Sequence, residues 1–205
     1  MKHFNQLMVG LLVSTAFIGC EKDPVEKPKA DLTPVEITLS RATAYGDDWI
    51  YFSFKEGKEV SVVEGEHSTN LNWDIAFNRY NIRTNSGKSG SGQGGAYDAG
   101  KVEFSSITEA PTSGYTVDTD YEISDVGSGF PPPMKISTAN TVLCQAIVFS
   151  GPPPAYTPNE HIYVIKTADG KYAKVIFSSF YDTKGNSGYI SFKYAYQPDG
   201  STSLK

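Results

Sequence analysis

The feature that most constrains this chain is a period-two alternation of apolar and polar residues that recurs along most of its length. The alternating segments are 35–39, 50–54, 71–77, 161–166, 172–177 and 189–196. They are rich in aromatic and β-branched residues, which is typical of half-buried strands, and helical periodicity is nearly absent. Turn dipeptides such as Asp169-Gly170 and Asp199-Gly200 separate the segments. The pattern predicts an all-β, predominantly antiparallel fold of two sheets in a single domain.

The N-terminal segment has the pattern of a sorting signal. Lys2 precedes an apolar run over residues 7–18, which is shorter than the roughly 20 residues of a membrane-spanning helix. The run ends in Gly19-Cys20, which resembles a bacterial lipoprotein cleavage site. We therefore expect a signal peptide at 1–19, a lipid on Cys20, a proline- and charge-rich tether at 20–34 and a folded domain at 35–205. An ordinary secretory signal is the alternative.

The charge and the cysteine content of the chain argue against several classes of function. Removal of residues 1–19 takes away one lysine and leaves 17 basic against 23 acidic residues. An acidic chain without a basic run is a poor match for nucleic acid. Once Cys20 carries lipid, Cys144 has no cysteine to pair with, and its apolar context predicts a buried free thiol. Since no nucleophile–base arrangement and no closed metal set is visible, we do not expect an enzyme.

A glycine-rich stretch at 86–95 interrupts the strand pattern. Gly87-Lys88-Ser89 matches the end of the phosphate-binding loop motif, but the first glycine of that motif falls on Ile82. Gly90, Gly92 and Gly95 fit a dinucleotide fingerprint, yet nothing after them is typical of a helix. We therefore predict an ordered excursion with several positive-φ glycines, packed closely against other backbone.

Two blocks of sequence resemble a known family. They comprise Trp73–Phe77, Arg79-Tyr80, Arg83, Asn85 and the glycine run, and then Phe149–Pro152, Tyr156, Ile162–Ile165 and Thr167–Lys171, completed by the C-terminal segments 173–182 and 188–196. In this order, over about residues 45–197, the chain resembles the HmuY family of Bacteroidetes haem-binding lipoproteins. The resemblance makes the glycine stretch a scaffold feature.

The resemblance implies a surface lipoprotein that takes haem from host haem carriers and passes it to a TonB-dependent receptor of the outer membrane. Haem is then a transported ligand, and the protein meets the membrane through its lipid only. Residues 21–23 (Glu-Lys-Asp) resemble the signal that directs such lipoproteins to the cell exterior. In this family two histidines or two methionines hold the iron, from loops that correspond here to 128–137 and 150–158.

The residues available as iron ligands depart from that pattern. Met134, behind Pro131–Pro133, is the one methionine left after signal removal, so one chain has no methionine pair. In the second loop Gly151 and three prolines stand where a ligand is expected. Tyr156 and His161 are the remaining candidates for the second ligand, and packing roles stay open for both and for Met134. His67 has the context of a solvated turn.

Two further interpretations complete the prediction. Asp74, Arg79 and Arg83 are expected to make polar contacts at a sheet edge. The alternative function is a HmuY-like binding module that has lost axial ligation and binds another small molecule, a glycan or a protein.

Overall fold

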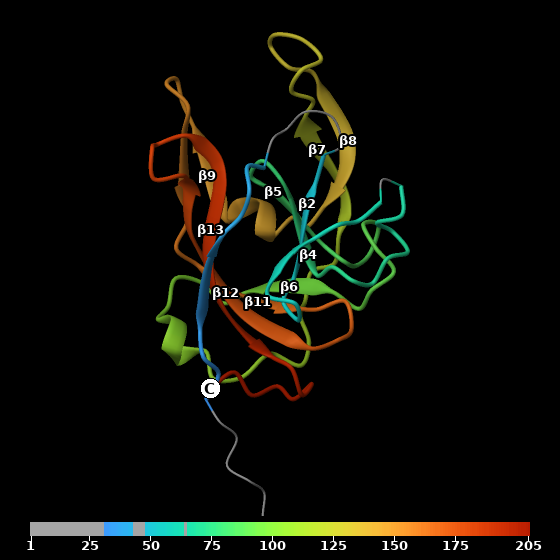
Figure 1. Cartoon of the computed structure of the whole chain (residues 1–205), viewed down its shortest axis with the longest axis vertical. Coiled ribbons are helices and arrows are strands. Elements are labelled where there is room, and N and C mark those ends of the chain that lie inside the picture. Colours follow the sequence, from blue (N-terminus) through green and yellow to red (C-terminus); the bar gives the residue numbers. More distant parts are fainter. Residues whose placement is uncertain (1–30, 43–47, 64) are drawn as a thin grey trace, which may run out of the picture. The chain divides into compact units, whose positions relative to one another are not determined.

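The computed structural model describes residues 31–42, 48–63 and 65–205 (Figure 1). The predicted signal peptide, Cys20 and most of the predicted tether lie outside the described residues. Within the described residues, no helix has the length and apolar character needed to cross a membrane.

The described chain is an assembly of antiparallel sheets, as the alternation predicts. The larger sheet has the order β1 (Val35–Thr38), β13 (Ser187–Gln197), β12 (Tyr172–Tyr181), β11 (Ile162–Lys166) and β6 (Gly95–Asp98). The smaller has the order β3 (Lys58–Val60), β2 (Ile50–Ser53), β4 (Ile75–Asn78) and β5 (Asn81–Thr84). Two separate two-stranded hairpins complete the fold. They are β7 (Thr119–Ser124) with β8 (Met134–Ala139) and β9 (Ile147–Ser150) with β10 (Ala155–Pro158). The only helical elements of the described residues are the 3₁₀ turns η1 (Phe104–Ser106) and η2 (Leu143–Gln145).

The main core lies between the two larger sheets. Phe52 and Phe77 of the smaller sheet contact Phe192 of β13 at ring-centroid distances of 5.2 and 6.1 Å. All three rings are buried. Burial of one large aromatic side chain contributes about 2 kcal/mol or more through the hydrophobic effect. The inward-facing half of each alternating strand therefore drives the packing of one sheet on the other.

The outer face of each sheet is also covered. Trp73 is fully buried on the outer face of the smaller sheet, where Tyr51 meets its ring edge-on at 5.1 Å. On the outer face of the larger sheet, Val164 packs with Ala110 and Leu204. The C-terminus is held there, because Leu32 donates a backbone hydrogen bond to Lys205.

The glycine-rich stretch wraps around one buried side chain, Asn85. The Asn85 amide donates to the carbonyls of Asn70 and Trp73, and its oxygen accepts from the backbone N–H of Gly92. A Cβ at Gly90 would lie 2.0 Å from Asn85 Oδ1, and one at Gly94 would lie 2.6 Å from the Asn85 carbonyl oxygen. The predicted close backbone packing is thus confirmed.

The expected backbone conformation of this stretch is only partly right. Gly87 and Gly95 have positive φ values of 53° and 158°, whereas Gly90, Gly92 and Gly94 do not. Those three are required for space and not for left-handed backbone.

Two expected boundaries are wrong. The strand predicted at 71–77 begins only at Ile75, since the Asp74 carboxylate occupies the junction and accepts the backbone N–H groups of Phe54 and Ala168. The loop expected at 128–137 ends at Pro133, because Met134 already pairs with Ser124 as the first residue of β8.

Candidate functional site

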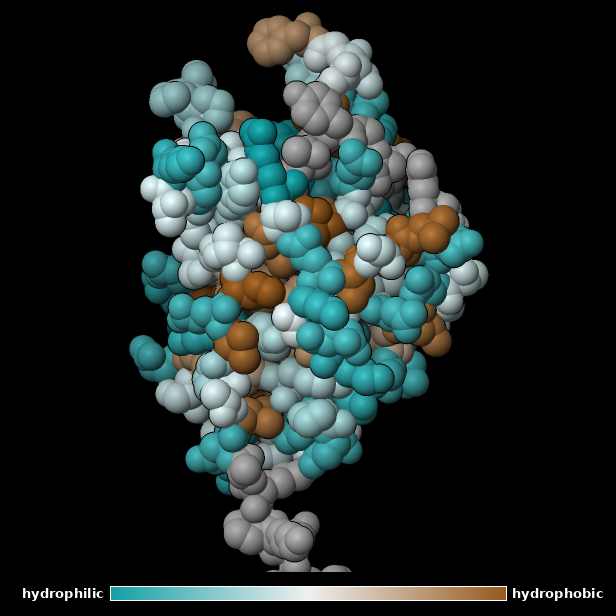
Figure 2. Space-filling view, in the orientation of Figure 1, coloured by the Kyte–Doolittle hydropathy of each residue, from teal (hydrophilic) through white to brown (hydrophobic). Residues whose placement is uncertain are grey.

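Two hairpins project from the same end of the described domain, β7–β8 on one side and β9–β10 on the other (Figure 1). Their tips are separated in the space-filling view (Figure 2). Residues 125–133 connect the strands of the first hairpin, and residues 151–154, a glycine followed by three prolines, connect those of the second. The loops that the family resemblance singled out therefore form the two rims of one region.

These hairpins expose an unusual share of apolar surface. Half of the exposed large apolar side chains of the described residues belong to them: Phe130, Met134, Ile136, Val148 and Phe149. Phe130 is 99% exposed and Met134 is 57% exposed. Exposed apolar side chains gathered on the same elements favour a binding role for those elements.

An aromatic cluster lies between the hairpins, centred on Tyr80. Arg79 and Tyr80 form the two-residue connection between β4 and β5, and Arg79 adopts a positive φ of 52° there. The Tyr80 ring stacks on Phe149 at 5.8 Å with an interplanar angle of 4°, and it contacts Tyr156 at 5.7 Å. The Arg79 guanidinium lies 5.2 Å from the Tyr80 ring centre, so the cluster carries a positive charge at its edge. We call Arg79, Tyr80, Phe149 and Tyr156 the aromatic site.

Met134 joins the aromatic site through a serine. The Ser124 hydroxyl lies 3.6 Å from Met134 Sδ, and its interaction with Tyr80 lowers the pKa of that phenol, against the larger effect of burial. Burial raises the pKa of Tyr80, so the phenol stays neutral and able to donate. The thioether is therefore placed on the β8 side of the site with much of its surface open to solvent.

Tyr156 also belongs to the aromatic site, but it is almost fully buried. Its hydroxyl accepts a 2.7 Å hydrogen bond from Arg79 Nη2, and its backbone N–H donates to the Tyr181 hydroxyl. To bind iron, this phenol would have to release the arginine.

His161 lies apart from the other two candidates. It precedes β11 in the larger sheet, and its Nδ1 lies 2.9 Å from the Asp98 carboxylate. Its ring stacks on Tyr163 and contacts none of the residues of the aromatic site. The structure thus brings Met134 and Tyr156 together around Tyr80 and leaves His161 on the sheet.

The remaining expectations have clear outcomes. Cys144 is a buried free thiol, as predicted, and burial raises its pKa to about 12. Asp74 makes polar contacts beside the smaller sheet, as expected, since its carboxylate accepts the backbone N–H groups of Phe54 and Ala168, and Arg83 lies on the edge strand β5; both side chains are buried. No group of three or more histidine, cysteine, aspartate or glutamate side chains within the described residues has the arrangement of a metal site.

Sequence reasoning missed Arg79, Tyr80 and Phe149 as site residues. Each was part of the family resemblance, but periodicity alone does not separate an aromatic residue in a core from one in a binding region. The signal that distinguishes them is exposure, which depends on the tertiary structure.

A comparison with models of protein families shows which family this chain belongs to. The family model described as HmuY protein matches residues 45–194. The chain belongs to the HmuY family. The match covers both sheets from β2 onwards and both projecting hairpins.

Solved structures related to this HmuY-family chain have the same fold. The apo HmuY analog of Tannerella forsythia is 22% identical, with a TM-score of 0.65, and the match covers 84% of this chain and 100% of that one. A proposed HmuY-like heme-binding protein of Bacteroides vulgatus is 25% identical, with a TM-score of 0.60 and coverage of 78% and 90%. A proposed lipoprotein of Bacteroides fragilis is 19% identical, with a TM-score of 0.63 and coverage of 80% and 91%. A search of curated proteins returned no match.

Proposed function

We propose that this HmuY-family chain is a lipid-anchored surface protein that binds haem or a related porphyrin and passes it to an outer-membrane receptor. The observation that carries the proposal is the aromatic site between two projecting hairpins, with a solvent-accessible thioether beside it. The proposal is further supported by family membership and by the heme-binding description of the Bacteroides vulgatus relative.

The aromatic site suits a flat macrocycle. The stacked rings of Tyr80 and Phe149 offer an apolar surface that is only partly covered, and Phe149 is 47% exposed. Arg79 adds a fixed positive charge beside that surface, which complements the carboxylate side chains of a natural porphyrin. Most of the binding energy then comes from buried apolar area of the ligand and not from iron ligation.

Met134 is the iron ligand that we propose for this site. The Met134 side chain is 57% exposed, and its sulfur accepts a weak hydrogen bond from Ser124. Tyr156 or water is the proposed second ligand, because His161 lies apart from the aromatic site and is paired with Asp98. The chemistry of His161 is nevertheless that of a metal ligand. Its Nδ1 is paired with the Asp98 carboxylate, an arrangement that leaves Nε2 available to a metal ion.

Titration with ferric and ferrous haem, followed by the Soret band, tests the proposal. Because thioether sulfur is a soft ligand, ferrous haem is expected to bind more tightly than ferric haem. Met134→Ala should remove most of that preference, and Met134→Leu provides the matched control that keeps the apolar volume. Phe149→Ala should weaken both oxidation states about equally. If haem does not bind the parent protein, the proposal fails.

A second function is favoured by one observation. The β9–β10 connection consists of Gly151 and three prolines and offers no histidine or methionine opposite Met134. A binding module without axial ligation would take a metal-free porphyrin or another flat ligand in the same place. Equal affinity for haem and for protoporphyrin IX, unchanged by Met134→Ala, would support this function over the first.

The surface location rests on the N-terminal sequence and on the lipoprotein description of the Bacteroides fragilis relative. Cys20→Ala is expected to release the protein from membranes into the soluble fraction, because the acyl chains provide the membrane affinity. Protease treatment of whole cells should degrade the lipidated parent protein if it faces the exterior. A variant that remains membrane-bound would contradict the lipid anchor.

A further inference from the structure

Two residues in the described part of the chain contain sulfur, and they differ in exposure. Met134, the first residue of β8, is 57% exposed, whereas Cys144 in η2 is 8% exposed. The Cys144 thiol donates to the Ile82 carbonyl, and burial raises its pKa to about 12. Since the thiolate is the reactive form of a cysteine, Cys144 stays inert at neutral pH. Met134 is therefore the sulfur of the described chain that a dissolved oxidant meets first.

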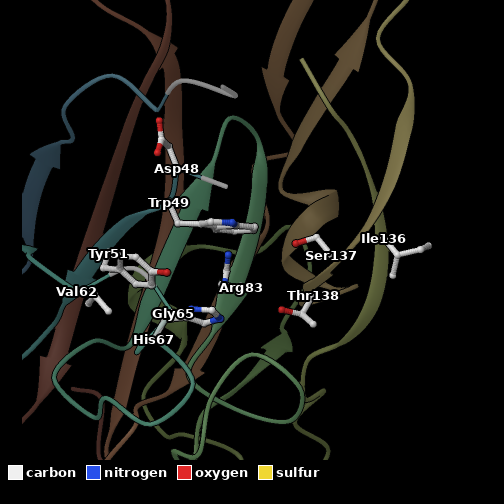
Figure 3. A pocket seen from close by; sticks show the side chains of 10 residues that line it. All are labelled: Asp48, Trp49, Tyr51, Val62, Gly65, His67, Arg83, Ile136, Ser137 and Thr138. Carbon is white, nitrogen blue, oxygen red and sulfur yellow. The ribbon is translucent and has the colours of Figure 1, made fainter. Parts of the chain in front are cut away.

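Met134 lies on an open face of the β7–β8 hairpin. Ile136, two residues later on the same strand, points away from the cavity beside Trp49 and Ser137 (Figure 3). Residues two positions apart share one face of a strand, so Met134 and Ile136 lie on the same face of β8. Ile136 is 66% exposed, so this face is open to solvent. A small oxidant reaches the thioether from this side.

The serine opposite Met134 is placed to hold the oxidised side chain. Met134 pairs with Ser124 of β7 in the hairpin register, and the Ser124 hydroxyl donates to Met134 Sδ over 3.6 Å. A thioether sulfur is a weak acceptor, whereas methionine sulfoxide carries a polar oxygen that accepts strongly. Addition of oxygen to Sδ therefore puts a better acceptor beside a donor that is already present. The hairpin accommodates the oxidised residue without losing this contact.

We propose that Met134 is a site of reversible oxidation by peroxides, and that this modification controls which oxidation state of haem the protein binds. The inference rests on the proposed ligation of haem iron by Met134. The sulfur lone pair forms a bond to one oxygen of hydrogen peroxide as the O–O bond breaks. The hydroxide that leaves takes the proton from the bound oxygen and becomes water. Sulfur is oxidised and the peroxide is reduced, and a methionine sulfoxide reductase reverses the change.

Oxidation changes the character of Met134 as a ligand. Thioether sulfur is a soft donor and favours ferrous iron, whereas a sulfoxide offers a harder oxygen. That oxygen also lies within reach of the Ser124 hydroxyl, which competes with iron for it. The preference for ferrous haem that is proposed for the parent protein should therefore disappear on oxidation. Binding of ferrous haem thus becomes dependent on the local concentration of peroxide.

Mass spectrometry of the peroxide-treated apoprotein tests the modification itself. Dilute hydrogen peroxide should add one oxygen atom to the peptide that contains Met134. Cys144 should stay a free thiol that an alkylating reagent captures after unfolding. In Met134→Leu the corresponding peptide should gain no oxygen. Oxidation of Cys144 before Met134, or an unmodified Met134 at peroxide concentrations that oxidise free methionine, would overturn the proposal.

Haem titration of the oxidised protein, after removal of the peroxide, tests the consequence. Ferrous haem should bind roughly tenfold more weakly than it binds the untreated parent, while the affinity for ferric haem changes much less. Incubation with a methionine sulfoxide reductase and its thiol reductant should restore the parental affinity. Met134→Leu is the matched control, and its affinities should be the same before and after peroxide treatment.

The outcomes separate this proposal from the proposed function. If Met134→Ala shows that the parent has no Met134-dependent preference for ferrous haem, ligation by Met134 is wrong and the proposed regulation fails with it. If the parent has that preference and the oxidised protein keeps it, only the proposed regulation fails. Thermal unfolding of the oxidised apoprotein should match that of the parent. A large loss of stability together with the loss of ferrous binding would attribute the effect to unfolding and contradict the proposal.

Discussion

The core between the two larger sheets and the pair of projecting hairpins use the same kinds of residue for opposite purposes. In the core, Phe52, Phe77 and Phe192 have almost no exposed surface. In the hairpins, Phe149 is 47% exposed and Phe130 is 99% exposed. Since folding gains little from the second group, their surface is better explained by a ligand than by stability. Aromatic content alone therefore does not point to the proposed binding region, whereas the contrast in burial does.

The hairpins also differ from the core in how they are anchored. A two-stranded hairpin is marginally stable on its own, so it needs contacts at its base. Asp118 precedes β7 and Asn140 follows β8, and the Asn140 amide donates a 3.0 Å hydrogen bond to the Asp118 carboxylate. The same carboxylate accepts the backbone N–H and the hydroxyl of Thr84 at the end of β5. A buried polar network thus fixes β7–β8 to the sheet while its tip carries exposed apolar residues.

The largest effect is expected from a matched pair of phenylalanine substitutions. Phe77→Ala should lower the free energy of unfolding by about 3–5 kcal/mol, because it leaves a cavity in a fully buried aromatic layer. Phe149→Ala should lower it by about 1 kcal/mol, the contribution of one aromatic pair. Chemical denaturation of the apoprotein measures both. Similar losses for the two variants would show that the hairpin belongs to the folding core.

A second pair of variants distinguishes two reasons why a position requires glycine. One is a lack of space for a Cβ atom, and the other is a positive φ. In Gly94→Ala the new Cβ would lie 2.6 Å from the Asn85 carbonyl oxygen, so we expect a loss of about 3 kcal/mol. In Gly185→Ala nothing lies within 4 Å, and the positive φ of 83° costs about 1 kcal/mol. Thermal unfolding of the apoprotein compares them. A Gly94 variant with parental stability but weakened ligand binding would make the glycine stretch a functional element.

The smallest effect concerns the pH dependence of the hairpin anchor. Burial raises the pKa of Asp118 above its ordinary value of 3.8, so the folded protein takes up this proton before the unfolded chain does. Stability should therefore fall as pH rises from 3.8 through the raised pKa, by at most about 1.4 kcal/mol per pH unit for one group.

Asp118→Asn removes that titration. The difference in unfolding free energy between parent and variant should change with pH in this window and become constant above it. A difference that is independent of pH would show that Asp118 does not titrate differently in the folded and unfolded states.

Much of the fold followed from local pattern. The alternation at 161–166, 172–177 and 189–196 predicted three strands that form the centre of the larger sheet, and Asp169-Gly170 lies in the turn between the first two. These predictions succeeded because successive side chains of a strand point to opposite faces of the sheet, which leaves a period of two in the sequence. The strand expected at 71–77 was too long, because a buried aspartate at position 74 binds backbone groups of two distant segments. No local pattern reports such long-range partners.

The candidate site was predictable only in outline. The resemblance pointed to the two loops, and Met134 lies at the base of the first, where Ser124 contacts its sulfur. Two side-chain pairs were not predictable from the sequence. Arg79 donates a hydrogen bond to Tyr156, 77 residues away, and His161 pairs with Asp98, 63 residues away.

The sequence by itself determined the all-β class, the family, the close packing of the glycine stretch and the burial of Cys144. Each depends on residues that are close in the chain or on a pattern repeated along it. Only the tertiary structure decided which aromatic residues remain exposed, which candidate ligands meet, and that Trp49 and Arg83 face β8 across a cavity. These features arise where strands distant in sequence pack together, and side-chain exposure is a property of that packing and not of the residue.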